Sequence, residues 1–561
     1  MMIMERLTQY GIVVGADESA NSGALCWKGV PFAKAPIGDL RWRAPVEPDC
    51  WSTPRPAVQF GNACVQVGRL YGPGRNNRYD RSIGDSIGDV SGSEDCLYLN
   101  IWVPASASGP LPVIVYIHGG SNVTGYTADP LYDGATLAVT ANAVVVTVNY
   151  RLGIFGFLNL PQMKTGGDPA GDSGNFALLD IYQALRFVNR NIGAFGGDSG
   201  KVTLMGQSAG AVNILALLAS PLLTAAQPPL VHRILPVSGG IAMAGDLPPG
   251  RLPLIHPAAA HAAQAEALVV HALVRAGRID DVKAAKQWIA DRSHAEVSSW
   301  LRAQDAEVLL RTVLVDLTPL GLAGSGPIPD GTIVPLAPLA AIHAGHYCKV
   351  PMLAGFTRDE GKLFPSMLAL SPALGQLSGR LLSDREVFSI QYSEQRDQAV
   401  QSSIEQWITP QLLPVWAPGT GFNARIEQLH ELLFWPNRDV VLDAVRAEQQ
   451  AVWAYQFDWD QQPPPFDDIY GAAHGFDVPF MFGNFGPSLF AATMNTSANR
   501  PGRLALSEAM MRSIGSFAWH GDPNHAELGV RWSAWPDMLR FDASASAPAI
   551  SVKARPEGAN S

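Results

Sequence analysis

A serine in a conspicuous turn sequence is the first residue of this chain that could do chemistry. Residues 206–210 read GQSAG, which fits the pattern G-x-S-x-G, between a predicted strand and a predicted helix. A serine at a sharp strand-to-helix turn needs glycines two residues to either side, because neighbouring chain passes close to them. The start of the helix offers free N–H groups to a developing negative charge. The sequence therefore predicts that Ser208 is a nucleophile.

A serine hydroxyl reacts slowly unless a base removes its proton. A positioned histidine can act as this base when a carboxylate orients its imidazole. The chain has 12 histidines and 50 acidic residues. The chemistry therefore predicts a histidine and a carboxylate that the fold brings to Ser208 from distant parts of the sequence.

The segments around Ser208 alternate between strand and helix patterns. Residues 112–117 (PVIVYI) and 143–149 (AVVVTVN) are almost wholly apolar, as strands buried on both faces of a parallel sheet are. Residues 176–191 have apolar side chains at helical spacing, and 202–205 form a strand before the GQSAG turn. This alternation predicts an α/β fold with a mostly parallel sheet.

The rest of the chain is predicted to elaborate one domain. Residues 1–541 contain no clear linker, and helical insertions are expected at about 245–345 and 364–450. Two further strands are expected at 350–356 and 455–458. Residues 542–561 are rich in Ala, Ser and Pro, which predicts a loose C-terminal tail.

Composition excludes several classes of function. The chain has 561 residues, 47% of them hydrophobic, and a net charge of −10, so overall disorder is excluded and nucleic acid is not an expected partner. Its apolar runs are much shorter than the ~20 residues that span a bilayer, so no membrane partner is expected. The N-terminus does not read as a signal peptide. We therefore expect a cytoplasmic protein on the sequence as given, and a periplasmic or secreted one if a leader was removed.

The metal-binding residue types are not arranged as ligands. The five cysteines include no C-x2-C pair, and His256, His261 and His271 do not follow the i, i+4 spacing of a helical metal site. We therefore expect neither a metal nor another cofactor.

Several motifs, taken in order, resemble one family. The set resembles the type-B carboxylesterases, which include cholinesterases and bacterial para-nitrobenzyl esterases, over about residues 20–540. The motifs are SEDCLYLN (93–100), HGG (118–120), NYRLG (149–153), FGGD (195–198), GQSAG (206–210), TRDEG (357–361), GAAHGFDVPFMFG (471–483) and GDPN (521–524).

The resemblance implies an α/β-hydrolase fold with a catalytic triad. The triad acid of the family maps to Glu360 and its base to His474, so the chain order would be Ser208, Glu360, His474. Asp359 is the rival for the acid. Adjacent side chains of an extended segment point to opposite faces, so only one of the two carboxylates can reach the imidazole.

The resemblance also implies an oxyanion hole of backbone N–H groups. Its donors map to Gly120, Ser121 and Ala209. Relatives usually have a third glycine or alanine where this chain has Ser121, and the alternative is a loop serine whose N–H faces elsewhere.

Four further features carry over as structural expectations. Ser238 resembles a residue that hydrogen-bonds the triad acid in relatives. Ion pairs are implied between Arg41 and Glu94 and between Arg151 and Asp180. Cys64 and Cys96 match a loop-closing disulfide, although without a signal peptide two free thiols remain the alternative.

The function implied is that of a bacterial-type serine carboxylesterase. It would hydrolyse small to medium organic esters through an acyl-enzyme intermediate. The alternatives are an amide or carbamate hydrolase with the same triad and a non-catalytic binding homologue. The partner expected is a small-molecule ester, and the sequence indicates no oligomeric state.

Overall fold

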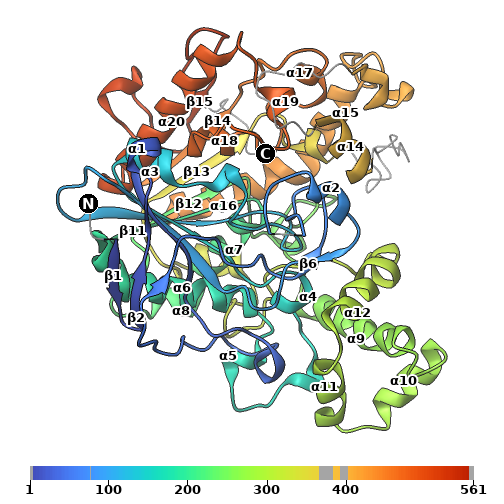
Figure 1. The fold of residues 1–561 in the computed structure, drawn as a ribbon. Helices are drawn as coiled ribbons and strands as arrows, with labels where there is room; N and C mark the ends of the chain where they lie inside the picture. The colour runs from blue at the N-terminus through green and yellow to red at the C-terminus, as the bar shows by residue number, and fades with distance from the viewer. Residues whose placement is uncertain (1–3, 76, 365–382, 392–401, 555–561) are drawn as a thin grey trace.

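The protein is described here from a computed structural model, in which residues 4–75, 77–364, 383–391 and 402–554 are described. Its centre is an 11-stranded sheet in the order β16-β15-β14-β13-β12-β11-β9-β10-β8-β4-β3 (Figure 1). The seven strands from β15 to β10 in this order run parallel to one another, and antiparallel strands flank them at both edges of the sheet. The strands are β3 (Ala16–Asp17), β4 (Ala24–Pro31), β8 (Tyr98–Pro104), β9 (Leu111–Ile117), β10 (Val144–Val148), β11 (Gly197–Gln207), β12 (Arg233–Val237), β13 (Met352–Thr357), β14 (Val452–Phe457), β15 (Met538–Phe541) and β16 (Ser551–Lys553).

The apolar strands predicted from the sequence lie in the middle of this sheet. Every residue of β9 and of β10 is buried, because helices cover both faces. Along β9, Val113, Val115 and Ile117 belong to one core layer, and Ile114 and Tyr116 belong to the other. A strand that contributes to two cores has no polar face, which explains its continuous apolar sequence.

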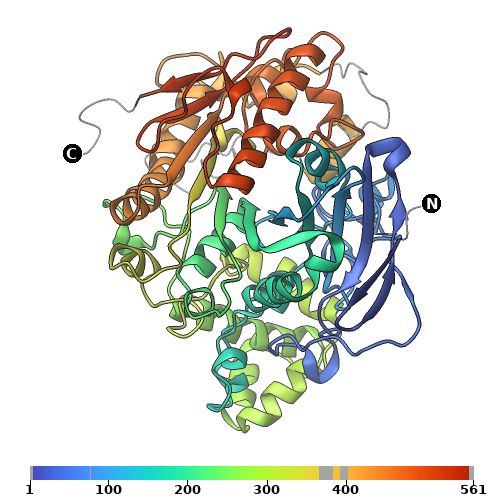
Figure 2. The ribbon, with the colours of Figure 1, turned by 90° about the vertical axis from the view of Figure 1, so that its left-hand side faces the viewer.

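Each face of the sheet has its own set of helices. The first core layer contains α6 (Phe176–Asn191), α7 (Ala209–Leu218) and α16 (Trp435–Glu448). The second contains α3 (Ala135–Ala141), α18 (Val478–Phe482) and α20 (Arg500–His520). Figure 2 shows the N-terminal strands at one flank of the molecule and the C-terminal strands at the opposite flank, as the strand order requires.

The helical insertions form two groups that lie apart (Figure 1). One group has its own small core and contains α9 (Ala258–Arg275), α10 (Val282–Ala290), α11 (His294–Arg302) and α12 (Ala306–Arg311). The other contains α14 (Asp384–Gln391), α15 (Phe422–Leu429), α17 (Phe466–Ile469) and α19 (Ala491–Met494). Part of the insertion expected at 364–450, namely 365–382 and 392–401, lies outside the described residues.

Part of the C-terminal segment, which we expected to be a loose tail, forms an edge strand. β16 pairs with β15 in antiparallel fashion, from Met538 opposite Lys553 to Arg540 opposite Ser551. Without this pairing the outer backbone groups of β15 would lack partners, which is a physical reason for the tail to fold back. The prediction of a loose segment was therefore wrong for residues 551–553; residues 555–561 lie outside the description.

The parallel strands bring the predicted site residues to one edge of the sheet. Strands β9, β11, β12, β13 and β14 are each followed along the chain by predicted site residues. The carboxyl ends of parallel strands meet at the same edge, where open α/β sheets hold their ligands. Among the described residues, no helix is both long and apolar enough to cross a membrane.

Candidate active site

Ser208 occupies a strained turn between β11 and α7. Its φ is 55° and its ψ −123°, a conformation that few non-glycine residues adopt. A side chain at Gly210 would lie 2.2 Å from the carbonyl oxygen of Ile117, and one at Gly206 would lie 2.6 Å from Gly210 itself. The two glycines therefore allow the close packing of chain that the G-x-S-x-G pattern predicts.

Glu360 and His474 form a buried hydrogen-bonded pair although 114 residues separate them. His474 Nδ1 lies 2.5 Å from Glu360 Oε2, and the carboxylate is fully buried. Its other oxygen accepts hydrogen bonds from Ser238 Oγ at 2.6 Å and from the Thr357 N–H at 3.0 Å. Burial alone would raise the pKa of Glu360, but the charge and hydrogen bond of His474, with the bonds from Ser238 and Thr357, lower it below its ordinary value.

Asp359, the rival for the acid, faces away from the imidazole. Its Oδ2 accepts hydrogen bonds from Arg358 at 2.7 Å and from the Ala472 N–H at 2.9 Å. The adjacent carboxylates thus point to different partners, although the chain is not extended here: β13 ends at Thr357, and Glu360 begins the short helix η8 (Glu360–Leu363).

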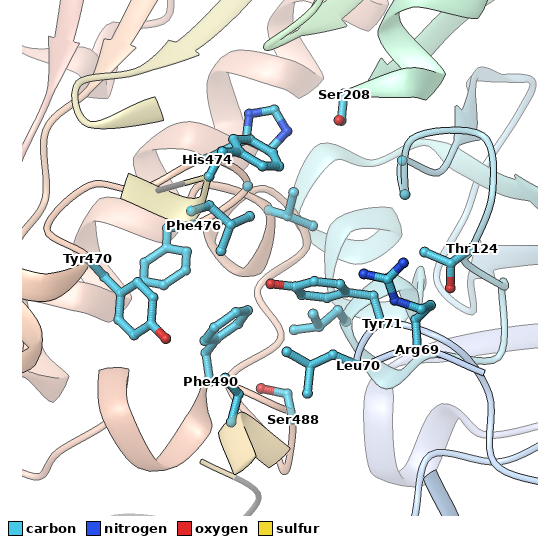
Figure 3. A pocket seen from close by; sticks show the side chains of 18 of the residues that line it. Arg69, Leu70, Tyr71, Thr124, Ser208, Tyr470, His474, Phe476, Ser488 and Phe490 are labelled. Atoms are coloured by element: carbon cyan, nitrogen blue, oxygen red, sulfur yellow. The ribbon is translucent and has the colours of Figure 1, made fainter. Parts of the chain in front are cut away.

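The second nitrogen of His474 is held by Gln207. The Gln207 side-chain nitrogen lies 3.1 Å from His474 Nε2. An amide nitrogen only donates and a carboxylate only accepts, so Nδ1 carries the proton and Nε2 accepts. This is the neutral tautomer that a base needs. Within the described part of the chain no hydrogen bond joins Ser208 Oγ to His474, although both side chains face the same cavity (Figure 3).

The predicted oxyanion donors lie beside Ser208. Gly120 and Ser121, with φ of 107° and 55°, line a cavity together with Ser208, and Ala209 lines a second one. Ala209 opens α7, so its N–H has no acceptor within the helix. The N–H groups of Gly120 and Ser121 donate no backbone hydrogen bond to other described residues. These three donors are therefore available to a substrate oxygen.

Two cavities meet at Ser208, with volumes of about 590 and 600 Å³. Ser121, Ser208, Phe364 and His474 line both of them. The first has aromatic walls that include Tyr71, Tyr470, Phe476 and Phe490 (Figure 3). The second is lined by aliphatic side chains, among them those of 252–255, by small residues of 321–326 and by Phe356, Phe364 and Phe434. We call it the aliphatic cavity.

The two expected ion pairs and the expected disulfide are present in the structure. Arg151 binds Asp180 through two hydrogen bonds of 2.8 and 2.7 Å. Arg41 binds Glu94 in the same bidentate way at 2.7 and 2.5 Å. Cys64 and Cys96 form a disulfide. This disulfide closes the loop that carries Tyr71 into the wall of the aromatic cavity.

Two residues near the imidazole were not singled out from the sequence. Gln207 is the variable position before the serine of G-x-S-x-G, so the motif itself could have drawn attention to it. Asp477 follows His474 by three residues; it is fully buried, accepts a hydrogen bond of 2.8 Å from Tyr455, and burial raises its pKa to about 7. Only the fold reveals this burial.

No group of three or more His, Cys, Asp or Glu side chains in the described ranges could hold a metal ion.

The chain matches the sequence model of the carboxylesterase family over residues 4–542. It is 30% identical over 535 residues to a para-nitrobenzyl esterase of Bacillus subtilis (strain 168), which covers 95% of this chain and 93% of the relative. It is also 30% identical over 541 residues to a fumonisin B1 esterase of Sphingopyxis macrogoltabida, with 95% and 84% covered.

Solved structures give the same result for the fold. A PNB esterase matches with a TM-score of 0.71 and 29% identity, over 99% of this chain and 98% of the other. A carboxylesterase of Geobacillus stearothermophilus matches with a TM-score of 0.69 and 29% identity over the same shares.

Proposed function

The chain belongs to the carboxylesterase family, and we propose that Ser208, His474 and Glu360 are the residues with which it cleaves esters. It is a carboxylic ester hydrolase with an α/β-hydrolase fold. The observation that carries the assignment is the Glu360–His474 hydrogen bond of 2.5 Å beside the strained turn of Ser208.

Acylation begins when His474 Nε2 takes the proton of the Ser208 hydroxyl. The Gln207 amide must first leave Nε2, since one lone pair cannot accept both donors. Ser208 Oγ then bonds to the ester carbonyl carbon. Glu360, kept ionised by its hydrogen bonds, stabilises the imidazolium that forms and fixes the orientation of the ring.

The negative charge on the carbonyl oxygen is stabilised by the N–H groups of Gly120, Ser121 and Ala209. Each donor of such a hole contributes about 2.7–4 kcal/mol to transition-state stabilisation, because it is already oriented when charge develops. The strain at Ser208 supports this role, since it aims Oγ and the following N–H at the same point.

Collapse of the intermediate releases the alcohol, which takes the proton from His474 Nε2. Water then enters, gives a proton to the same nitrogen and attacks the acyl carbon. The bond from that carbon to Ser208 Oγ breaks, Nε2 returns the proton to Oγ, and the acid leaves. The leaving alcohol must lie within hydrogen-bond reach of Nε2. Gln207, which holds Nε2, lines the aromatic cavity and not the aliphatic one, whereas Glu360 lines the aliphatic one. We therefore place the alcohol part in the aromatic cavity and the acyl part in the aliphatic cavity.

Turnover of para-nitrophenyl acetate tests the proposal. The wild-type chain should release nitrophenol, and Ser208→Ala should lower kcat by about 10⁴-fold or more while the thermal unfolding midpoint is kept. Ser299→Ala, an exposed serine on α11, is the matched control and should keep full activity. Undiminished turnover in Ser208→Ala would contradict the assignment. A matched anilide separates ester from amide preference, and a binding protein would release no nitrophenol at all.

A further inference from the structure

Lys362 is a buried cation in the wall of the aromatic cavity. It lies in the short helix η8 (Glu360–Leu363), two residues after the proposed acid, and its side chain is only 3% exposed. The nearest carboxylate oxygen, Asp359 Oδ1, lies 3.9 Å from Lys362 Nζ, which is beyond hydrogen-bond distance. Among the described residues, no acceptor takes a hydrogen bond from this ammonium group.

Asp359 binds its other donors through Oδ2, whereas Oδ1, the oxygen nearest to Lys362, accepts no hydrogen bond from the described residues. Arg358 and the Ala472 N–H both bond to its Oδ2, and Arg358 extends to Asp460 at 3.0 Å. An ammonium has three N–H donors, and none of those of Lys362 has an acceptor on the described residues. Burial lowers the pKa of Lys362, and the charge of Asp359 opposes that effect. The group therefore keeps hydrogen-bonding capacity that an acceptor inside the cavity can satisfy.

The other charged groups of this cavity are differently placed. Arg69 is half exposed and pairs with Asp384 at 2.7 Å. Asp129 accepts a hydrogen bond from the Leu131 N–H, and burial raises its pKa to about 6. Lys362 is thus the one Lys or Arg among the described lining residues that is both buried and without a hydrogen-bonded carboxylate.

Aromatic rings line the same cavity as this charge. The rings of Tyr470, Phe476 and Phe490 form a continuous cluster, with centroids 4.8 Å apart for Phe476 and Phe490 and 5.7 Å apart for Tyr470 and Phe490 (Figure 3). Such walls favour a flat or apolar group, and a few placed polar groups then fix its orientation. An apolar body with one anionic substituent is complementary to both features.

We propose that Lys362 recognises an anionic substituent, a carboxylate, on the alcohol part of the ester substrate. This inference rests on the proposed function and on placing the alcohol in the aromatic cavity. A charge-assisted hydrogen bond to Lys362 would favour such an ester over its neutral analogue. The preferred substrate class would then be aryl or otherwise apolar alcohol esters that carry a free carboxylate.

The test compares acetate esters that differ only in this charge. The probes are meta- and para-acetoxybenzoate and para-acetoxyphenylacetate, each matched with its carboxamide, so that the distance from ester to carboxylate varies. For each pair, kcat/KM of the carboxylate is divided by kcat/KM of the carboxamide. This quotient is then divided by the corresponding quotient of the alkaline hydrolysis rates, which removes differences in intrinsic reactivity, and the result is called the ratio below. The best pair should give a ratio of about tenfold or more in the wild type, which is the size expected of one hydrogen bond to a charged group.

Variants identify the group responsible. Lys362→Met should bring the ratio to about one or below, and Lys362→Arg should keep it above one. Because the ratio is taken within one variant, any general damage to the neighbouring Glu360 cancels. Lys349→Met removes an exposed lysine that pairs with Glu448 at 2.9 Å, and it should leave the ratio at the wild-type value.

Two results would overturn the inference. One is a wild-type ratio of one or less for every pair, and the other is a raised ratio that persists in Lys362→Met. Both leave ester hydrolysis itself intact, because the carboxamide probes are still cleaved. A chain that cleaves none of the probes and no para-nitrophenyl acetate would instead contradict the proposed function.

Discussion

The side-chain nitrogen of Gln207 lies 3.1 Å from His474 Nε2, the atom that we propose accepts the proton of Ser208. The amide donor stabilises the neutral ring in the tautomer that acts as a base, and it also occupies the lone pair that the serine needs. Gln207, the residue before Ser208, is therefore placed to influence both the availability of Nε2 and the basicity of the proposed base.

Replacing Gln207 with a carboxylate should change the pH dependence. In Gln207→Glu the new negative charge beside the ring favours the imidazolium, which cannot act as a base. The acid limb of kcat/KM for para-nitrophenyl acetate should move to higher pH by about one unit, measured between pH 5 and 9. Gln207→Met, similar in size but uncharged, is the control. An equal upward shift in both variants would contradict the electrostatic explanation.

Asp477 should make the stability depend on pH. Its pKa in the folded protein is about 7 against an ordinary value of 3.8, so the folded state binds more protons between these values and stability falls as the pH rises through them. Asp477→Asn cannot ionise. Its stability relative to wild type, measured as the difference in unfolding free energy, should therefore be higher at pH 8 than at pH 5, by a few kcal/mol at about 1.4 kcal/mol per pH unit.

Urea unfolding at the two pH values checks this prediction. Asp280→Asn, at an exposed position, is the control and should change stability equally at both. If Asp477→Asn behaves in the same way as this control, Asp477 does not carry the pH dependence.

The buried Arg151–Asp180 pair should be costly to break from one side. The two side chains are 4% and 0% exposed, so Arg151→Met leaves a buried carboxyl group without its partner. The expected loss is about 3–5 kcal/mol of unfolding free energy. Removing the second partner as well, in Arg151→Met with Asp180→Leu, should restore part of it.

An exposed pair on α20 provides the comparison. Arg512 and Glu508 lie 2.7 Å apart with side chains 42% and 57% exposed, and Arg512→Met should cost less than about 1 kcal/mol. Similar losses in thermal or urea unfolding for Arg151→Met and Arg512→Met would contradict the argument from burial.

The disulfide can be checked by counting thiols and by unfolding. With Cys64 and Cys96 joined, the unfolded, unreduced chain should expose three thiols, those of Cys26, Cys50 and Cys348. A bond across 32 residues stabilises by about 3–4 kcal/mol in the loop-entropy account. Cys64→Ser with Cys96→Ser should therefore lower the unfolding midpoint.

The same double variant should raise KM for aryl esters, because the loop between the two cysteines carries part of the aromatic wall. Cys50→Ser, at an exposed free thiol, should change neither property. Five titratable thiols in the unreduced protein would show that the pair is not oxidised.

The sequence alone determined those features that depend on local geometry. GQSAG encodes its turn because only glycine permits the close packing of chain at 206 and 210. The runs at 112–117 and 143–149 identified β9 and β10, since strands with two buried faces have no polar positions. The helix at 176–191 matches α6 in both bounds. The edge strand β16 was missed, because its sequence is polar and only pairing with β15 orders it.

Tertiary structure decided the contacts and the burial that arise when residues distant in sequence pack together. Whether Asp359 or Glu360 faces His474 is set by how the chain after β13 lies against residues 472–474. Local pattern treats the two carboxylates alike, and only the family resemblance favoured Glu360. The contact of Gln207 with the imidazole and the burial of Lys362 and Asp477 arise in the same way. Local patterns fix backbone conformation, whereas hydrogen-bond partners and desolvation depend on which segments the fold packs together.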